Sequence, residues 1–372
     1  MAREANATLS DRIMIESPLL AMTRTTPTDY WNDSCAVDEL EYAVARGASG
    51  ATSNPPIVLE VLRHDPDPWR ARARELYAAF PTWSERELTW QLVEELAVRA
   101  AAVLTPVFEA TAGAKGRLSL QTDPTLYRDS AAMSAQAVHF AGLAPNIQVK
   151  LPVTSAGLAA IEDATAAGVH INATVNFTLA GALAVGEAVE RGLARWAAAG
   201  HDPASLHPVC TLMVGRLDDW LKADAEREGL VPTPGVLDWA GIAVFKRAAA
   251  LYGARGYRTR LLAAAYRHRL HWTELVGGDV ILTMPHAWQV RFNASGITPA
   301  PRIAEPVPAP VLDELGTLAE FRAAYEPDGL TIAQLDTYGA TVRTLRQFIG
   351  AYHELQATVR DFVLPNPDQR PA

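Results

Sequence analysis

The amino-acid sequence predicts an α/β fold, a (β/α)8 TIM barrel with extra helices. Short apolar runs alternate with longer stretches in which apolar residues recur at helical spacing, and this alternation repeats eight times. Repeated strand–helix units favour a parallel sheet, and eight of them are typical of a closed barrel. The chain has 372 residues, of which 49% are hydrophobic, enough for one such barrel with a large core.

The eight predicted strands are short, and nearly all lie next to an amphipathic stretch. Examples are residues 178–199 after the fifth strand and residues 237–252 before the seventh. The predicted strands are residues 30–34, 50–54, 117–122, 147–153, 171–177, 208–214, 259–265 and 280–284.

Three segments fall outside this repeat. Residues 1–29 carry little periodicity and are interpreted as an irregular arm or a short helix. Residues 57–114 form a predicted helical insertion, and residues 310–362 form a predicted helical tail after a proline-rich connector. Apolar residues of the tail recur at helical spacing, so we expect it to pack on the barrel within a single domain, residues 1–372.

Composition and charge narrow the class of protein. The formal net charge of −9 argues against a general nucleic-acid binder, although it permits a local basic pocket for a small anion. No apolar run reaches the roughly 18 residues that would span a bilayer, and charges interrupt the first residues as they would not in a signal peptide. We therefore expect a cytoplasmic protein without membrane partners, with Cys35 and Cys210 reduced.

Lys150 is the most informative polar residue. In residues 147–152 the period of two places Gln148 and Lys150 on one face and aliphatic residues on the other. A lysine inside a barrel loses solvation, which lowers its pKa and supplies a neutral amine that can attack a carbonyl. The alternative is an ordinary lysine with its ammonium at the surface or in a salt bridge.

Other polar residues recur near the carboxyl ends of successive predicted strands, where barrel enzymes place their active sites. Burying such side chains costs free energy unless they are hydrogen-bonded or functional. These residues are Asp33, Asn54, Ser119, Gln121, Asp123, Asn172, Thr174, Asn176 and Thr211.

The order of these residues resembles the transaldolase family. Residues 50–58, with the run Thr52-Ser53-Asn54-Pro55, are similar to the first transaldolase signature, and residues 147–154 are similar to the second, which contains the Schiff-base lysine. The resemblance continues through residues 168–174, 214–216 and 274–277 and covers about residues 30–290. Chain length and residues 283–285 resemble the longer bacterial transaldolases more than the compact aldolases of the superfamily.

The resemblance implies a role for each matching residue. Lys150 would form the imine, Asp33 would move protons at the substrate hydroxyls, and Thr174 would position a water for proton relay. Substrate binding would fall to Asn54 and Asn172 along the sugar chain and to Thr211, Arg216 and Arg267 at a terminal phosphate. Arginine suits phosphate because its planar guanidinium offers a fork of donors. A surface ion pair with Asp218 or Asp219 is the alternative for Arg216.

Three residues depart from the transaldolase pattern. Gln121 stands where transaldolases have a glutamate and instead resembles fructose-6-phosphate aldolases; glutamine cannot take up a proton as glutamate can. Met213 stands where transaldolases have phenylalanine and the aldolases have tyrosine, and Asn176 occupies a usually apolar position on the inward face of strand five. We include Gln121 among the catalytic residues, and Met213 and Asn176 among those that bind an unusual sugar.

The resemblance therefore implies transfer of a three-carbon ketol unit from a ketose phosphate to an aldehyde acceptor, within the carbohydrate metabolism of the pentose phosphate pathway. Alternatives are aldol cleavage as in fructose-6-phosphate aldolases and a non-catalytic sugar-phosphate-binding homologue. No glycine-rich dinucleotide motif is present, so no cofactor is expected. His268 and His271 lack a carboxylate or cysteine at ligand spacing, so no metal site is expected, and residues 267–271 are interpreted as an anion-binding rim. The expected partners are small sugar substrates, and a contact with another copy of the chain is an alternative role for the tail.

Overall fold

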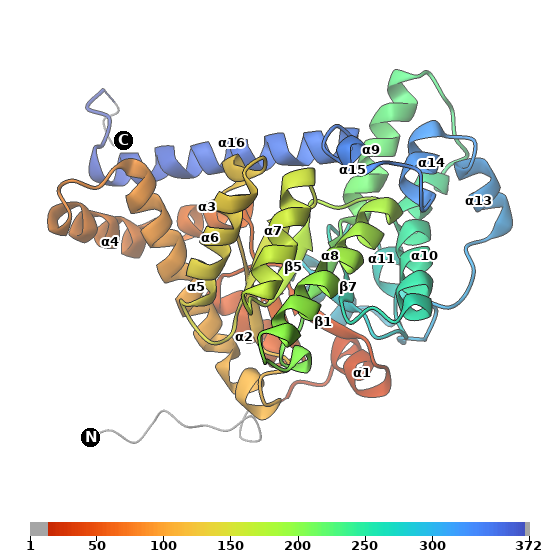
Figure 1. Cartoon of the computed structure of the whole chain (residues 1–372), viewed down its shortest axis with the longest axis horizontal. Coiled ribbons are helices and arrows are strands. Elements are labelled where there is room, and N and C mark those ends of the chain that lie inside the picture. Colours follow the sequence, from red (N-terminus) through yellow and green to blue (C-terminus); the bar gives the residue numbers. More distant parts are fainter. Residues whose placement is uncertain (1–13, 369–372) are drawn as a thin grey trace.

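The fold of the chain is a closed barrel of eight parallel strands surrounded by helices, as predicted. Figure 1 shows the computed structural model, which describes residues 14–368. Each strand pairs with its neighbour in sequence, and β1 closes the barrel against β8. The strands are β1 (Asp29–Asn32), β2 (Gly50–Thr52), β3 (Arg117–Gln121), β4 (Ile147–Pro152), β5 (Ile171–Thr174), β6 (Val209–Leu212), β7 (Arg260–Ala263) and β8 (Ile281–Met284).

All eight predicted strands are found, and most end one to three residues earlier than the sequence suggests. Strand β5 shows the physical reason. Val175 adopts a left-handed backbone with φ of 56°, which a β-branched residue rarely does, so the strand ends at Thr174. The alternation of inward and outward side chains stops there as well.

Helices alternate with the strands and cover the outside of the barrel. They are α1 (Pro18–Thr25), α2 (Val37–Val44), α6 (Ser130–Ala141), α7 (Ser155–Ala166), α8 (Leu179–Ala198), α9 (Val214–Arg227), α10 (Ala240–Arg255), α11 (Leu270–Thr273) and α12 (His286–Asn293). The predicted insertion forms α3 (Pro55–His64), α4 (Pro66–Ala79) and α5 (Glu85–Ala110). The predicted tail forms α13 (Ala309–Leu315), α14 (Ala319–Tyr325), α15 (Ile332–Leu335) and α16 (Gly339–Val363). The sequence predicts an irregular arm or a short helix over residues 1–29. Residues 1–13 lie outside the described residues, and α1 is a short helix in the remainder of this segment.

Two apolar cores stabilise the fold. The larger one lies between the strands and the helices, where outward-facing strand residues such as Leu118, Val149 and Ala173 are fully buried. The smaller one is formed by Trp31, Val209, Leu262, Ala264 and Ile281. Because side chains alternate along a strand, these residues share the inward face with polar residues. The barrel interior therefore contains both apolar and polar side chains.

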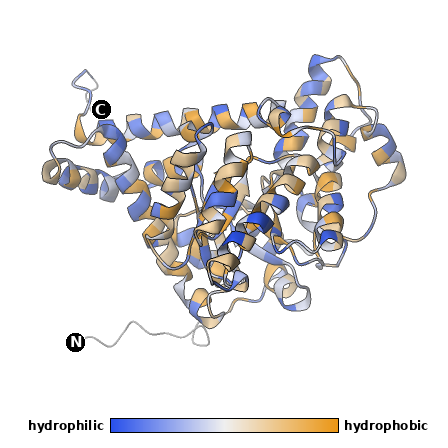
Figure 2. Cartoon of the chain, in the orientation of Figure 1, coloured by the Kyte–Doolittle hydropathy of each residue, from blue (hydrophilic) through white to orange (hydrophobic). Residues whose placement is uncertain are grey.

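Helix α16 spans the barrel on the side of the carboxyl ends of the strands (Figure 1). It packs against α3, α5 and α9, which follow β2, precede β3 and follow β6. Hydrophobic and hydrophilic residues alternate along it (Figure 2), and its buried face includes Leu345, Phe348, Tyr352 and Leu355. Helix α16 of the tail thus lies against helices of the barrel and of the insertion. Within residues 14–368, no helix has both the length and the apolar character needed to cross a bilayer.

Candidate active site

Lys150 lies inside the barrel on β4, with only 5% of its surface exposed. Its Nζ donates a hydrogen bond to the backbone oxygen of Ser53 at 3.1 Å. Burial, reinforced by the charge of Arg216 and opposed by that of Asp33, lowers the pKa of Lys150 to about 8. About a tenth of the amine is then neutral at pH 7.

Lys150 also differs from the other lysines of the chain in its partners. The other three each form an ion pair with a carboxylate: Lys115, Lys222 and Lys246. Lys150 forms none with the described residues, so the salt-bridge alternative does not apply. A buried, partly neutral amine without a carboxylate partner is suited to attack a carbonyl carbon.

Asp33 follows β1 and provides a carboxylate at the same end of the barrel. Its Oδ1 accepts a hydrogen bond from the hydroxyl of Thr52 at 2.6 Å, and this hydroxyl also lies 2.6 Å from that of Thr283. Burial raises the pKa of Asp33, although the positive charge of Lys150 and the hydrogen bond from Thr52 act in the opposite direction. A carboxyl group with a raised pKa beside an amine with a lowered pKa is an arrangement suited to proton transfer.

Gln121 and Thr174 lie on the strands on either side of Lys150. Gln121 pairs in register with Lys150, and Thr174 pairs with Pro152 two residues further along β4. The Gln121 Oε1 and Thr174 Oγ1 atoms are buried and have no hydrogen-bond partner among the described residues. Because most buried polar atoms are hydrogen-bonded, two such atoms beside Lys150 favour a site that binds polar ligand atoms.

A chain of side-chain hydrogen bonds crosses the barrel interior next to Lys150. Thr211 donates to the Asn172 Oδ1 at 2.7 Å, the Asn172 Nδ2 donates to the Ser119 Oγ at 3.1 Å, and Ser119 donates to the Gln148 Oε1 at 3.0 Å. All of these residues are buried. The network fixes the side chain of Asn172, which pairs in register with Lys150.

Three arginines from different elements line one cavity of about 360 Å³ beside α16. Arg216 is on α9, Arg267 follows β7 and Arg343 is on α16. The other lining residues are Asp219, Ala340, Thr344 and Gln347. We call this cavity the arginine pocket.

The arginine pocket carries an excess of positive charge, with three guanidinium groups and one carboxylate. Arg267 forms two hydrogen bonds to the Asp219 Oδ2, at 2.7 and 2.9 Å. Arg216 donates to the Gln347 Oε1 and lies over the ring of Phe348 at 5.3 Å, and it pairs with neither Asp218 nor Asp219. Both Arg216 and Arg267 lower the pKa of Asp33, so the pocket lies within electrostatic reach of the carboxylate.

The family is decided by comparison with known proteins. A family model described as transaldolase/fructose-6-phosphate aldolase matches residues 30–352. The chain belongs to this family. A transaldolase of Mycolicibacterium smegmatis is 30% identical over 301 residues, which cover 73% of this chain and 80% of that protein. A transaldolase of Thiobacillus denitrificans is 30% identical over 363 residues, covering 88% and 96%. Transaldolase 1 of Streptomyces coelicolor is 36% identical over 213 residues, and the chain spans only 56% of its length.

Three residues expected to bind substrate, Asn54, Met213 and Thr211, do not line the arginine pocket. Asn54 caps α3 by accepting a hydrogen bond from the backbone of Ile57 at 3.1 Å, and its side chain is half-buried. Met213 is buried at the start of α9. Thr211 is absent from the lining of the arginine pocket, where Thr344 and Arg343 of α16 are found instead. The binding roles of Asn54, Met213 and Thr211 stay predictions.

Asn176 is not on the inward face of β5, and that expectation is wrong. The strand ends at Thr174, and the left-handed backbone of Val175 redirects the chain. The Asn176 Oδ1 accepts from the backbone of Thr178 at 3.3 Å, and its Nδ2 lies 3.7 Å from the Cys210 sulfur. The side chain of Asn176 therefore contacts the backbone at the start of α8.

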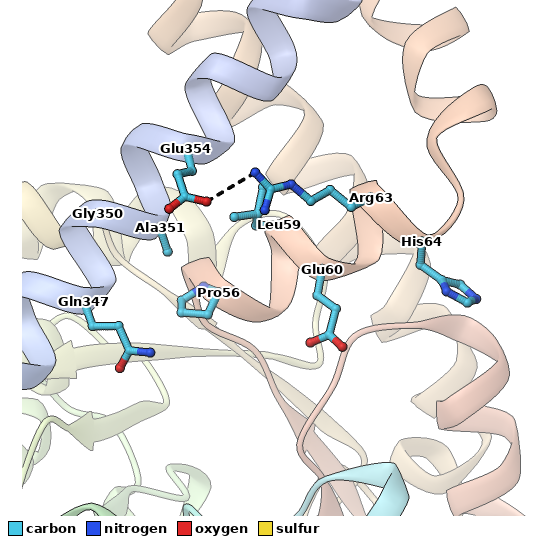
Figure 3. A pocket seen from close by; sticks show the side chains of 9 residues that line it. All are labelled: Pro56, Leu59, Glu60, Arg63, His64, Gln347, Gly350, Ala351 and Glu354. Carbon is cyan, nitrogen blue, oxygen red and sulfur yellow. Dashed lines mark hydrogen bonds and ion pairs between the residues drawn. The ribbon is translucent and has the colours of Figure 1, made fainter. Parts of the chain in front are cut away.

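A further cavity lies outside this cluster, between α3 and α16, with a volume of about 630 Å³ (Figure 3). Arg63 and Glu354 form an ion pair across it at 3.2 Å. It shares Gln347 with the arginine pocket, but Lys150 and Asp33 do not line it. This cavity, although larger than the arginine pocket, therefore lacks the buried lysine and carboxylate.

The two histidines within residues 267–271 lie close to a carboxylate that is distant from them in the sequence. His268 and His271 both contact Asp218 of α9, and their ligand atoms lie within 4.8 Å of one another, as a metal site would require. The prediction of no metal site rested on the absence of a carboxylate near these histidines. That premise is wrong. The hydrogen bonds of His271, described below, bear on whether the cluster binds a cation.

Gly215 allows α9 to approach the loop after β7. A Cβ atom at this position would lie 1.9 Å from the backbone oxygen of Ala265. We expect Gly215→Ala to lower the free energy of unfolding by about 1–3 kcal/mol, because two backbones would have to separate. Chemical denaturation measures this change. The control is Gly253→Ala in α10, where a Cβ meets no atom within 4 Å and stability should rise by about 0.5–1 kcal/mol. Equal effects at the two positions would contradict the argument.

The lowered pKa of Lys150 predicts a pH dependence that can be measured without substrate. The rate of reductive methylation at Lys150 should rise with pH and reach half its maximum near pH 8, because only the neutral amine reacts. Arg216→Met should move this midpoint upward, since the charge of Arg216 lowers the pKa of Lys150. Mass spectrometry of peptides follows each lysine separately, and a midpoint near 10 in the unmodified protein would disprove the prediction.

Proposed function

We propose that this chain is a transaldolase that transfers a three-carbon ketol unit from a ketose phosphate to an aldehyde acceptor through an imine on Lys150. The observation that carries the proposal is the Lys150 amine, which is buried, has no carboxylate partner among residues 14–368 and has a pKa of about 8. Membership of the family and the name transaldolase of several relatives support the reaction class.

The reaction begins with attack of the neutral Lys150 amine on the ketose carbonyl carbon. Loss of the carbonyl oxygen as water, with uptake of one proton from solvent, gives the protonated imine. Thr174 and Gln121, whose buried oxygens have no hydrogen-bond partner among the described residues, would hold the departing water. Asp33 then accepts the proton of the C4 hydroxyl while the C3–C4 bond breaks. The aldehyde product leaves, and the electron pair of that bond stays on the lysine-bound three-carbon enamine.

Transfer requires that the enamine wait for an acceptor aldehyde. The enamine carbon attacks the carbonyl of the acceptor, Asp33 returns its proton to the new hydroxyl, and water hydrolyses the imine to release the product. Gln121 cannot exchange a proton as glutamate would, which slows hydrolysis of the waiting intermediate. Met213 has no proton to offer the enamine, so release of a free three-carbon ketone is slow, and this favours transfer over simple aldol cleavage.

The arginine pocket is the proposed binding site for the terminal phosphate of donor and acceptor. Guanidinium groups match phosphate oxygens with pairs of donors, and three of them exceed the one carboxylate of the pocket. The transaldolase resemblance implies phosphate binding by Arg216 and Arg267. Arg343 is added by its place on the same cavity.

The experiment is borohydride trapping with a ketose phosphate donor, followed by peptide mass spectrometry. We expect the reduced three-carbon unit on Lys150 and on no other of the four lysines. In a coupled assay, consumption of the donor should be slow alone and strongly accelerated by an aldehyde phosphate. Labelling of another lysine would overturn the imine assignment, and rapid release of a free three-carbon ketone without acceptor would establish aldol cleavage instead.

A further inference from the structure

Asp218, His271 and the backbone of Arg267 form a chain of hydrogen bonds next to the arginine pocket. Asp218 is on α9, two residues after Arg216, and its side chain is fully buried. Its Oδ2 accepts from the His271 Nε2 at 2.8 Å, and its Oδ1 accepts from the backbone of Gly241 at 2.9 Å. The Nδ1 of His271 accepts from the backbone N–H of Arg267 at 3.1 Å.

The two partners of His271 determine where its proton lies. The backbone N–H of Arg267 can only donate, so the Nδ1 of His271 carries no proton. Burial opposes ionisation of Asp218, but hydrogen bonds from His268 and His271 outweigh it and lower the pKa of the carboxyl. The ionised carboxylate can only accept, so the Nε2 of His271 carries the proton. His271 is therefore a neutral imidazole held in one tautomer.

This tautomer disfavours a metal ion in the cluster. A metal bound through the Nε2 of His271 would need the lone pair of that atom, and the proton would have to move to Nδ1. Nδ1 already receives the N–H of Arg267 at 3.1 Å, so two donors would then face each other. The hydrogen bonds of the cluster instead connect two segments: the backbone that carries Arg267 and α9, which carries Arg216.

We propose that His271 is a positioning residue which, held by Asp218, sets the backbone of Arg267 so that Arg267 and Arg216 face the same phosphate. A second contact between these segments lies at Gly215, where the backbone of α9 packs against Ala265. The inference rests on the proposed phosphate-binding role of the arginine pocket. His271 itself does not line that pocket.

Two substitutions separate the two hydrogen bonds of His271. The amide nitrogen of glutamine reaches about the position of Nε2, so His271→Gln keeps the donor to Asp218 and removes the acceptor for Arg267. The amide oxygen of asparagine reaches about the position of Nδ1, so His271→Asn keeps the acceptor for Arg267 and removes the donor to Asp218. His268→Gln is the matched control, because His268 contacts Asp218 at 3.4 Å and has no hydrogen bond to Arg267.

The readouts are KM for phosphorylated and non-phosphorylated aldehyde acceptors and the inhibition constant of inorganic phosphate. His271→Gln should raise KM for the phosphorylated acceptor and the inhibition constant about five- to tenfold, the effect of one lost hydrogen bond, with kcat and the non-phosphorylated KM unchanged. His271→Asn should raise both constants by a similar factor, because it breaks the same link at Asp218 instead of at Arg267. His268→Gln should stay within about twofold, whatever its thermal stability.

Each failure points to a different error. Equal losses with phosphorylated and non-phosphorylated acceptors in either His271 variant, or equal losses in His271→Gln and His268→Gln, would make His271 merely structural. An unchanged His271→Gln variant would also refute the proposal, provided that Arg216→Met raises KM for the phosphorylated acceptor. If Arg216→Met leaves that KM unchanged, the phosphate-binding role of the arginine pocket is itself wrong.

Discussion

Lys150→Arg is expected to abolish turnover, with kcat/KM reduced on the order of 10⁴-fold or more. The guanidinium keeps the positive charge but stays protonated at any working pH, so it cannot attack a carbonyl carbon. Donor consumption in a coupled assay and borohydride trapping should be lost together, since both depend on the imine.

Lys222→Arg is the matched control for this substitution. Lys222 forms an ion pair with Asp238 at the surface, which arginine can also form, so activity and trapping should be unchanged. Thermal unfolding should show that the Lys150→Arg variant is folded. Retention of more than about a hundredth of the activity in a folded variant would mean that the reaction does not use a lysine imine.

The barrel could be predicted from sequence because its pattern is local and repeated. In β4 the alternation of Gln148 and Lys150 with aliphatic residues identifies the inward face within six residues. The same rule applied to β3 places Ser119 and Gln121 inward. The structure agrees, because Ser119 donates a hydrogen bond to Gln148 and Gln121 pairs in register with Lys150. Pattern and fold match wherever the backbone stays extended.

The same rule failed at Asn176 for a physical reason. A period of two holds only while each residue has extended dihedral angles, and Val175 has a φ of 56°. Nothing in the residues 171–176 taken alone marks Val175 for a left-handed backbone, because such a conformation suits glycine or asparagine better. A local pattern of polar and apolar residues therefore could not predict where this strand ends.

The contributions of the tail and of the Asp218 cluster depend on contacts between distant parts of the chain. Arg343 reaches the arginine pocket because α16 crosses the barrel more than a hundred residues after Arg216. His271 finds its carboxylate on α9, 53 residues earlier. Helical periodicity predicts that α16 buries one face, but it does not say which end of the barrel that face covers.

Asp33→Asn is expected to separate imine formation from cleavage of the carbon–carbon bond. The amide can keep the hydrogen bond from Thr52 that the Asp33 Oδ1 accepts at 2.6 Å, so the geometry should be conserved. It cannot take the proton of the C4 hydroxyl, and kcat for cleavage should fall about 10²–10⁴-fold. The measurement is the consumption of a ketose phosphate in the presence of an aldehyde acceptor.

Imine formation should respond in the opposite direction in the same variant. The negative charge of Asp33 raises the pKa of Lys150, so its removal should move that pKa below about 8 and increase the neutral amine at pH 7. Borohydride trapping of a free three-carbon ketone, which needs no bond cleavage, should therefore be as fast as in the unmodified protein or faster. If trapping and cleavage fell by the same factor, Asp33 would be needed to form the imine, and its assignment as the base for bond cleavage would be wrong. A loss confined to cleavage would identify Asp33 as the residue that takes up the proton released when the ketose is split.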